Sequence, residues 1–169
     1  MKHLILVRHA KSSWKDSTLE DHERPLNKRG KREAPFMAKK FGEQKMKVDL
    51  IVSSTAERAM STAKEFAKKL DYKAGKIVGD AELYLVEADE LLAYVKKFDD
   101  DNKCVMLFGH NPGLTWFANY LTNGKIENVP TSGIVAIDFD VKSWNEIAEG
   151  TGIVRFFEYP KMYLKEDEE

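Results

Sequence analysis

Short apolar runs, each followed by polar residues, recur along the first two thirds of the chain. Residues 4–7 (LILV) and 104–108 (CVMLF) are apolar without interruption, a pattern typical of strands that are buried on both faces of a parallel sheet. The runs at 48–52 and 76–78 are shorter or interrupted by a charged residue, and they predict two further strands. Parallel strands need crossover connections, which are usually helices.

The segments between these runs carry apolar residues at helical spacing, which gives a helix one stripe to bury. The clearest stripe is formed by Ala34, Met37, Ala38 and Phe41. Further helices are predicted over about 56–70, over about 89–98, and after Gly113. Ser54 or Thr55 is the predicted N-cap of the first of these, because a hydroxyl oxygen accepts a free backbone N–H there.

The end of the chain has a different pattern. Residues 133–139 and 153–157 predict two strands without an intervening helix, which indicates an antiparallel pair. The sequence therefore predicts one α/β domain over residues 1–164, with three α/β/α layers around a mainly parallel sheet that has an antiparallel C-terminal part. Residues 165–169 are expected to form an acidic tail.

Composition narrows the class of protein. The chain has 169 residues, of which 43% are hydrophobic and 33% charged, with a formal net charge of −1. Nothing in this balance suggests binding to nucleic acid or to an acidic membrane. Cys104 is the single cysteine, so a disulfide within the chain is impossible. This favours a location in a reducing compartment. With no signal peptide or membrane-spanning stretch in view, a cytoplasmic location is expected.

Charged and imidazole side chains follow three of the predicted strands. Arg8 and His9 follow the first, Arg58 falls in the first helical turn after the second, and His110 follows the run at 104–108. Parallel strands bring these residues to one edge of the sheet. Arginine forks and helix N-termini both bind phosphate oxygens, so a phosphoryl group is the expected ligand. A metal site is not expected, because two arginines would repel a cation.

Four segments resemble the histidine phosphatase superfamily, which has the phosphoglycerate-mutase-like fold. Residues 6–10 (LVRHA) resemble its Arg-His-Gly signature, with Ala10 in place of the glycine. Residues 53–59 (SSTAERA) resemble its second-arginine segment, and residues 109–113 (GHNPG) its second-histidine segment. Together with residues 24–30 (RPLNKRG), they are most similar to the SixA subgroup, the phosphohistidine phosphatases.

The resemblance implies roles for these residues. His9 would be the nucleophile that becomes phosphorylated, and Arg8, Arg58 and His110 would hold the phosphoryl oxygens, with no cofactor. Lys11 and Lys15 stand where many mutase-like members have a glutamate and an asparagine, which changes one phosphate contact.

A proton donor for the leaving group is expected in the region after the third predicted strand. Glu82 is the candidate, and the alternatives are a neighbouring carboxylate (Glu87, Asp89 or Glu90) or no acid at all. Arg24 is a candidate substrate contact, and its alternative is a loop ion pair with Asp21 or Glu23.

The expected activity is hydrolysis of a phosphoryl group through phosphohistidine on His9. The chain between the second predicted strand and Cys104 is short, so little of it can form a lid and an open site is expected. An open site suits a phosphorylated protein, for example a histidine-containing phosphotransfer domain. A small-molecule phosphomonoesterase, a phosphoglycerate-type mutase and a non-catalytic phosphoprotein-binding module are the alternatives.

Overall fold

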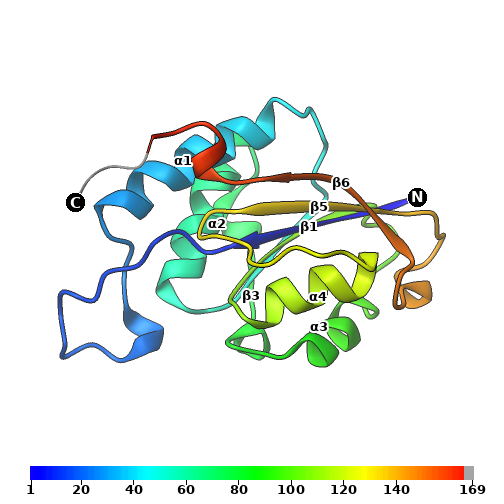
Figure 1. Cartoon of the computed structure of the whole chain (residues 1–169), viewed down its shortest axis with the longest axis horizontal. Coiled ribbons are helices and arrows are strands. Elements are labelled where there is room, and N and C mark those ends of the chain that lie inside the picture. The colour runs from blue at the N-terminus through cyan, green and yellow to red at the C-terminus, as the bar shows by residue number, and fades with distance from the viewer. Residues whose placement is uncertain (166–169) are drawn as a thin grey trace.

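A six-stranded mixed sheet forms the centre of the computed structural model, which describes residues 1–165 (Figure 1). The strand order is β3-β2-β4-β1-β5-β6, with β1 to β4 parallel and β5 and β6 antiparallel to their neighbours. The bounds are β1 Lys2–Arg8, β2 Leu50–Ser53, β3 Val78–Gly79, β4 Cys104–Gly109, β5 Ile134–Phe139 and β6 Gly152–Glu158. The predicted fold class, including the antiparallel C-terminal part, is confirmed.

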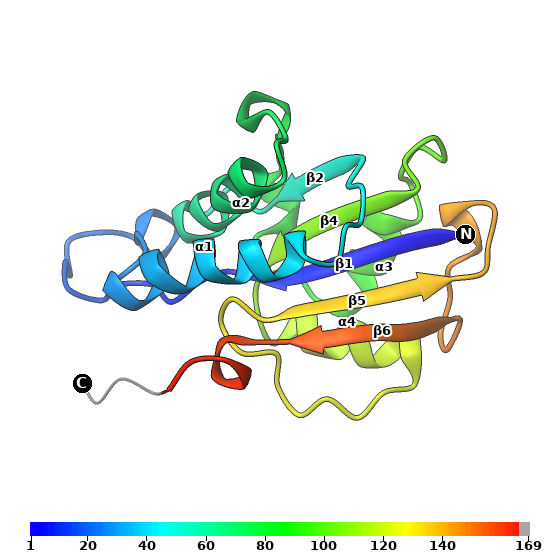
Figure 2. The ribbon, with the colours of Figure 1, turned by 90° about the horizontal axis from the view of Figure 1, so that it is seen from above.

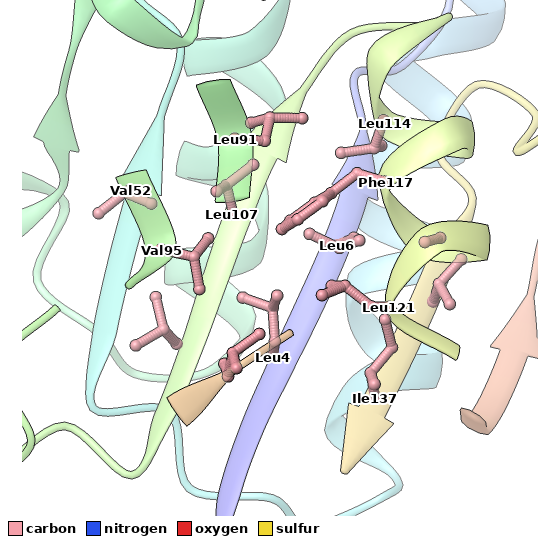
Figure 3. Packing of buried hydrophobic residues seen from close by; sticks show 14 of the residues in the cluster. Leu4, Leu6, Val52, Leu91, Val95, Leu107, Leu114, Phe117, Leu121 and Ile137 are labelled. Carbon is pink, nitrogen blue, oxygen red and sulfur yellow. The ribbon is translucent and has the colours of Figure 1, made fainter. Parts of the chain in front are cut away.

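Two helices cover each face of the sheet, as Figure 2 shows from above. The bounds are α1 Lys28–Gly42, α2 Glu57–Lys69, α3 Ala88–Val95 and α4 Gly113–Thr122. Leu4 and Leu6 of β1 pack into the cluster beneath α3 and α4 (Figure 3), whereas Ile5 and Val7 pack into the cluster beneath α1 and α2. This alternation buries β1 on both faces and explains its uninterrupted apolar sequence.

The local predictions differ from the structure at two points. β3 is limited to two residues, and the preceding residues Ala74–Lys76 form a short 3-10 helix. Ala56, not Ser54 or Thr55, is the N-cap of α2. Ser54 lies two residues before this cap, where its hydroxyl accepts the N–H of Ala56 at 3.2 Å and lies 2.8 Å from Nε2 of His110.

The long connection between β1 and α1 is anchored to the body of the domain. Its one short 3-10 helix is Asp21–Glu23. Gly30 in α1 packs so closely against this connection that a Cβ there would lie 2.1 Å from the carbonyl oxygen of Lys11. The tail predicted for residues 165–169 lies, after its first residue, outside the described part of the chain. Within residues 1–165, no helix combines the length and apolarity needed to cross a lipid bilayer.

Candidate active site

The carboxyl ends of three parallel strands meet at one edge of the sheet. Arg8 at the end of β1 pairs with Gly109 at the end of β4, and Ser53 at the end of β2 pairs with Phe108. Ligands of open α/β sheets bind at such an edge. The next residues along the three strands are His9, His110 and Ser54.

A pocket of about 160 Å³ lies at this edge. The structure brings five of the predicted site residues into its wall, namely Arg8, His9, Arg24, Arg58 and His110. All but Arg8 are less than 9% exposed. Their catalytic roles stay predictions, but their convergence from four separate segments gives one cationic pocket beside two imidazoles.

His9 is held through one of its ring nitrogens. Nδ1 lies 2.7 Å from the carbonyl oxygen of Ala10 and donates its hydrogen to it, so Nε2 carries the lone pair. Ala10 is fixed in turn by Thr62, whose hydroxyl accepts the Ala10 N–H at 2.9 Å and donates to the carbonyl of Arg58 at 2.7 Å. Burial lowers the pKa of His9 to about 4, and the charges of Arg58 and Arg8 act in the same direction. The ring is therefore neutral at neutral pH.

His110 is oriented by Ser54. The ring centroids of His110 and His9 are 5.2 Å apart, and His110 Nε2 lies 2.8 Å from Ser54 Oγ. Ser54 Oγ already accepts the N–H of Ala56 at 3.2 Å, which favours donation of its own hydrogen to Nε2 and leaves the ring hydrogen on Nδ1. Burial, followed by the neighbouring His9 and Arg58, lowers the pKa of His110 to about 3. It is thus a neutral donor.

Asp21 holds two of the arginines. Arg58 donates from NH2 to Asp21 Oδ2 at 2.9 Å and from NH1 to the Asp21 carbonyl at 2.7 Å. Arg24 donates from Nε to Asp21 Oδ1 at 3.1 Å and from NH1 to Ser12 Oγ at 2.8 Å. The hydroxyl of Tyr84 donates to the same carboxylate. The hydrogen bonds from Tyr84 and then Arg58 lower the pKa of Asp21 to about 2.

These contacts make Asp21 a candidate positioning residue for the two arginines. In Asp21→Asn we expect kcat to fall about 10- to 100-fold, because misplaced substrate-holding groups have costs of this order. The affinity for inorganic phosphate should fall by no more than about threefold, because the loss of a negative charge beside the pocket favours binding of an anion. Steady-state kinetics and phosphate titration measure the two effects separately. A parallel loss of phosphate affinity and kcat would contradict the positioning role.

Three buried nitrogens in the pocket residues have no hydrogen-bond partner within residues 1–165. They are Arg8 Nε, Arg58 Nε and His110 Nδ1. Buried polar groups are rarely left unpaired in folded proteins, and those that are can pair with water, an ion or a ligand. The guanidinium nitrogens carry hydrogens, and so does His110 Nδ1 in the tautomer derived above, so all three are candidate donors to an anion in the pocket.

Glu82 does not lie in this pocket. It belongs to the 3-10 turn Ala81–Leu83, which buries Leu83 in the core and leaves Glu82 exposed. Its side chain lines a second hollow of about 680 Å³ beside α3. The neighbours considered with it, Glu87, Asp89 and Glu90, are also exposed and do not line the His9 pocket. No carboxylate is among the lining residues described for that pocket.

Two exposed apolar side chains line the mouth. Trp14 is 74% exposed, and its ring lies with its centroid 3.4 Å from the guanidinium carbon of Arg24. Leu85 is 53% exposed and has a φ of 53°. That left-handed conformation costs a residue with a Cβ roughly 1–2 kcal/mol.

Several of these residues have no recognisable signal in the sequence. Asp21 was considered only as an ion-pair partner for Arg24; that pair forms, yet Arg24 also lines the pocket. The position of Ser54 before a helix predicts only a cap, and no pattern in the sequence distinguishes Tyr84 or Leu85. A resemblance at residues 24–30 located Arg24, but no local pattern shows that a tyrosine 63 positions beyond Asp21 donates to it.

Comparison with known proteins identifies the class of protein that has this site. Residues 4–84 match the model of the histidine phosphatase superfamily (branch 1). An uncharacterized chloroplastic protein of Arabidopsis thaliana is 30% identical over 153 residues, which cover 86% of this chain and 70% of the relative. The chain belongs to the histidine phosphatase superfamily.

Solved structures of similar fold include SixA proteins. The SixA of Agrobacterium tumefaciens, a candidate phosphohistidine phosphatase, superposes with a TM-score of 0.80 and 26% identity over 94% of this chain and 98% of its own. A protein histidine phosphatase SixA complexed with tungstate has a TM-score of 0.77 at 21% identity, over 92% and 95% of the two chains. At the lower identity the likeness shows the fold alone.

Proposed function

We propose that the chain is a phosphatase that transfers a phosphoryl group to Nε2 of His9 and then to water. We propose further that its substrate is a phosphorylated side chain of another protein, with phosphohistidine as the leading candidate. The observation that carries the proposal is a neutral imidazole with its lone pair on Nε2 in a pocket walled by guanidinium groups. A neutral imidazole is nucleophilic, and fixed positive charge favours its attack on an anionic phosphoryl group.

The proposed reaction has two steps. First, the Nε2 lone pair of His9 forms a bond to phosphorus while the bond between phosphorus and the leaving group breaks. Water then attacks phosphorus, the N–P electron pair returns to Nε2, and both protons of the water leave with inorganic phosphate or pass from it to solvent. Arg8, Arg58 and His110 hold the phosphoryl oxygens throughout. The guanidinium groups supply the positive charge that phosphoryl transfer requires, so the proposal includes no metal ion.

The absence of a carboxylic acid from the described pocket lining bears on the substrate. Asp21 is the carboxylate nearest in the hydrogen-bond network, and its low pKa keeps it ionised and unable to donate a proton. An alkoxide leaving group would therefore depart without an acid. The imidazole of phosphohistidine can leave as a neutral ring when its second nitrogen carries a proton. The pocket thus favours a leaving group that needs no donor.

Pocket size bears on the partner. A volume of about 160 Å³ is below the roughly 300–1,000 Å³ of pockets that enclose small organic ligands. It can hold a phosphoryl group and little of what carries it, and exposed Lys11 and Trp14 border its mouth. A side chain that projects from another protein, such as a histidine-containing phosphotransfer domain, fits this shape. A mutase would need to enclose its substrate between two transfers.

The test is a search for acid-labile phosphate on His9. The protein is incubated with phosphohistidine, phosphotyrosine and phosphoserine peptides, quenched in alkali and analysed by mass spectrometry. We expect phosphate on His9 and its loss in His9→Ala, together with turnover. His3→Ala is the matched control, since His3 pairs with Asp138 and does not line the pocket. Turnover that survives in His9→Ala would exclude the mechanism.

A further inference from the structure

Two apolar side chains at the pocket mouth are not explained by phosphate binding. Trp14 and Leu85 both line the pocket and come from segments about seventy residues apart. Each leaves at least half of its surface exposed. A phosphoryl group needs cations and hydrogen-bond donors, which other residues of the pocket provide. The apolar pair is therefore available to contact what carries the phosphoryl group.

Trp14 is held by one face only. The guanidinium of Arg24 lies against that face, with its central carbon 3.4 Å from the ring centroid. Arg24 is itself buried and fixed by Ser12 and Asp21, so the stack orients the indole beside the pocket. An exposed fraction of 74% leaves the other face open. An aromatic face beside a phosphate site can stack on a ring.

Leu85 keeps a strained backbone without gaining burial. Its φ of 53° is one that leucine rarely adopts, and its side chain is half exposed. The adjacent residue Val86 lies tightly against α4, where a Cβ on Gly113 would come within 2.2 Å of the Val86 carbonyl oxygen. This packing fixes the segment that presents Leu85. Backbone outliers of this kind concentrate at ligand sites.

We propose that Trp14 and Leu85 form an apolar clamp that selects substrates whose phosphoryl group is attached to a planar ring, as in phosphohistidine or phosphotyrosine, over those with an alkyl carrier. Trp14 supplies a stacking face, and Leu85 supplies apolar contact to the same group. The inference rests on the proposed function and specifies which residues discriminate between substrates. It also agrees with the leaving-group argument, because ring carriers are the better leaving groups.

Binding of two phosphonates tests the clamp without catalysis. Phenylphosphonate and methylphosphonate present the same anionic group on a ring and on an alkyl carbon, and neither P–C bond is open to hydrolysis by this mechanism. By calorimetry we expect the wild type to bind phenylphosphonate about tenfold more tightly. We call the ratio of the methylphosphonate to the phenylphosphonate dissociation constant the preference. In Trp14→Ala the preference should fall to about one, and Trp14→Phe should keep most of it. Inorganic phosphate should bind all three proteins within about threefold.

Two further variants separate the clamp from general surface effects. Trp116→Ala is the matched control, because Trp116 is 63% exposed and does not line the pocket; its preference should equal the wild type's. Leu85→Gly should lower the preference without lowering the thermal midpoint, since glycine adopts a positive φ without strain. Normal phosphate binding with a wild-type preference near one, or a preference kept in Trp14→Ala, overturns the clamp alone. Failure of the wild type to bind phosphate or phosphonate overturns the proposed function as well.

Discussion

Replacing Arg58 with alanine is expected to lower kcat/KM for a phosphohistidine peptide by about 10²–10³-fold, the usual effect of removing one group that stabilises transition-state charge. Arg58 is 3% exposed and lines the pocket, and its Nε has no hydrogen-bond partner among residues 1–165. Its other two nitrogens are held by Asp21. A guanidinium fixed in this way stabilises the transferring group without first having to reorganise.

Two variants separate the chemistry of Arg58 from its charge and from folding. Arg58→Lys keeps the charge but loses the fork, and its activity should lie between those of the wild type and Arg58→Ala. Arg155→Ala is the control, because Arg155 is half exposed and pairs with Asp138 on the surface; it should retain full activity. Circular dichroism and the thermal midpoint establish that each variant folds. Activity of folded Arg58→Ala within threefold of the wild type would remove Arg58 from the mechanism.

The part of the site that lies on regular elements could be predicted from the sequence. An uninterrupted apolar run identifies a buried strand, and a parallel arrangement fixes where its carboxyl end lies. Arg8, His9 and His110 follow such runs directly, so their convergence follows from strand order alone. The position of Arg58 can be predicted in the same way, because it lies in the first turn of the helix that follows β2. The sheet and its four covering helices were predictable for the same physical reason.

The connections could not be predicted in the same way, because their conformations depend on contacts distant in sequence. Glu82 illustrates this: one 3-10 turn, capped by Asp80 accepting the Glu82 N–H at 2.9 Å, decides that Leu83 points inward and Glu82 outward. Asp21 meets Arg58 across 37 positions. No local periodicity encodes either outcome. The resemblance gives only the region in which an acid is expected, whereas this turn decides which side chain faces the pocket.

Mild acid is expected to destabilise the fold through the two pocket histidines. The pKa is about 4 for folded His9 and about 3 for folded His110, mainly because both are buried, against 6.5 for an ordinary histidine. Below pH 6.5 the unfolded chain therefore binds protons that the folded chain does not, and stability falls as the pH is lowered towards the folded values. Between pH 7 and pH 5 the free energy of unfolding should drop by about 2 kcal/mol for each histidine.

Urea unfolding at pH 7 and pH 5 in buffers without phosphate measures this loss. Carboxylates stay largely ionised over that interval, since even an unperturbed Asp or Glu titrates near pH 4. His9→Gln and His110→Gln should each remove about half of the loss. Inorganic phosphate should also reduce it, because a bound anion favours the protonated rings of the folded state. A wild-type free energy of unfolding that is equal at the two pH values would show that these imidazoles are not held neutral by burial, and the lone pair required for attack by His9 would lose its structural basis.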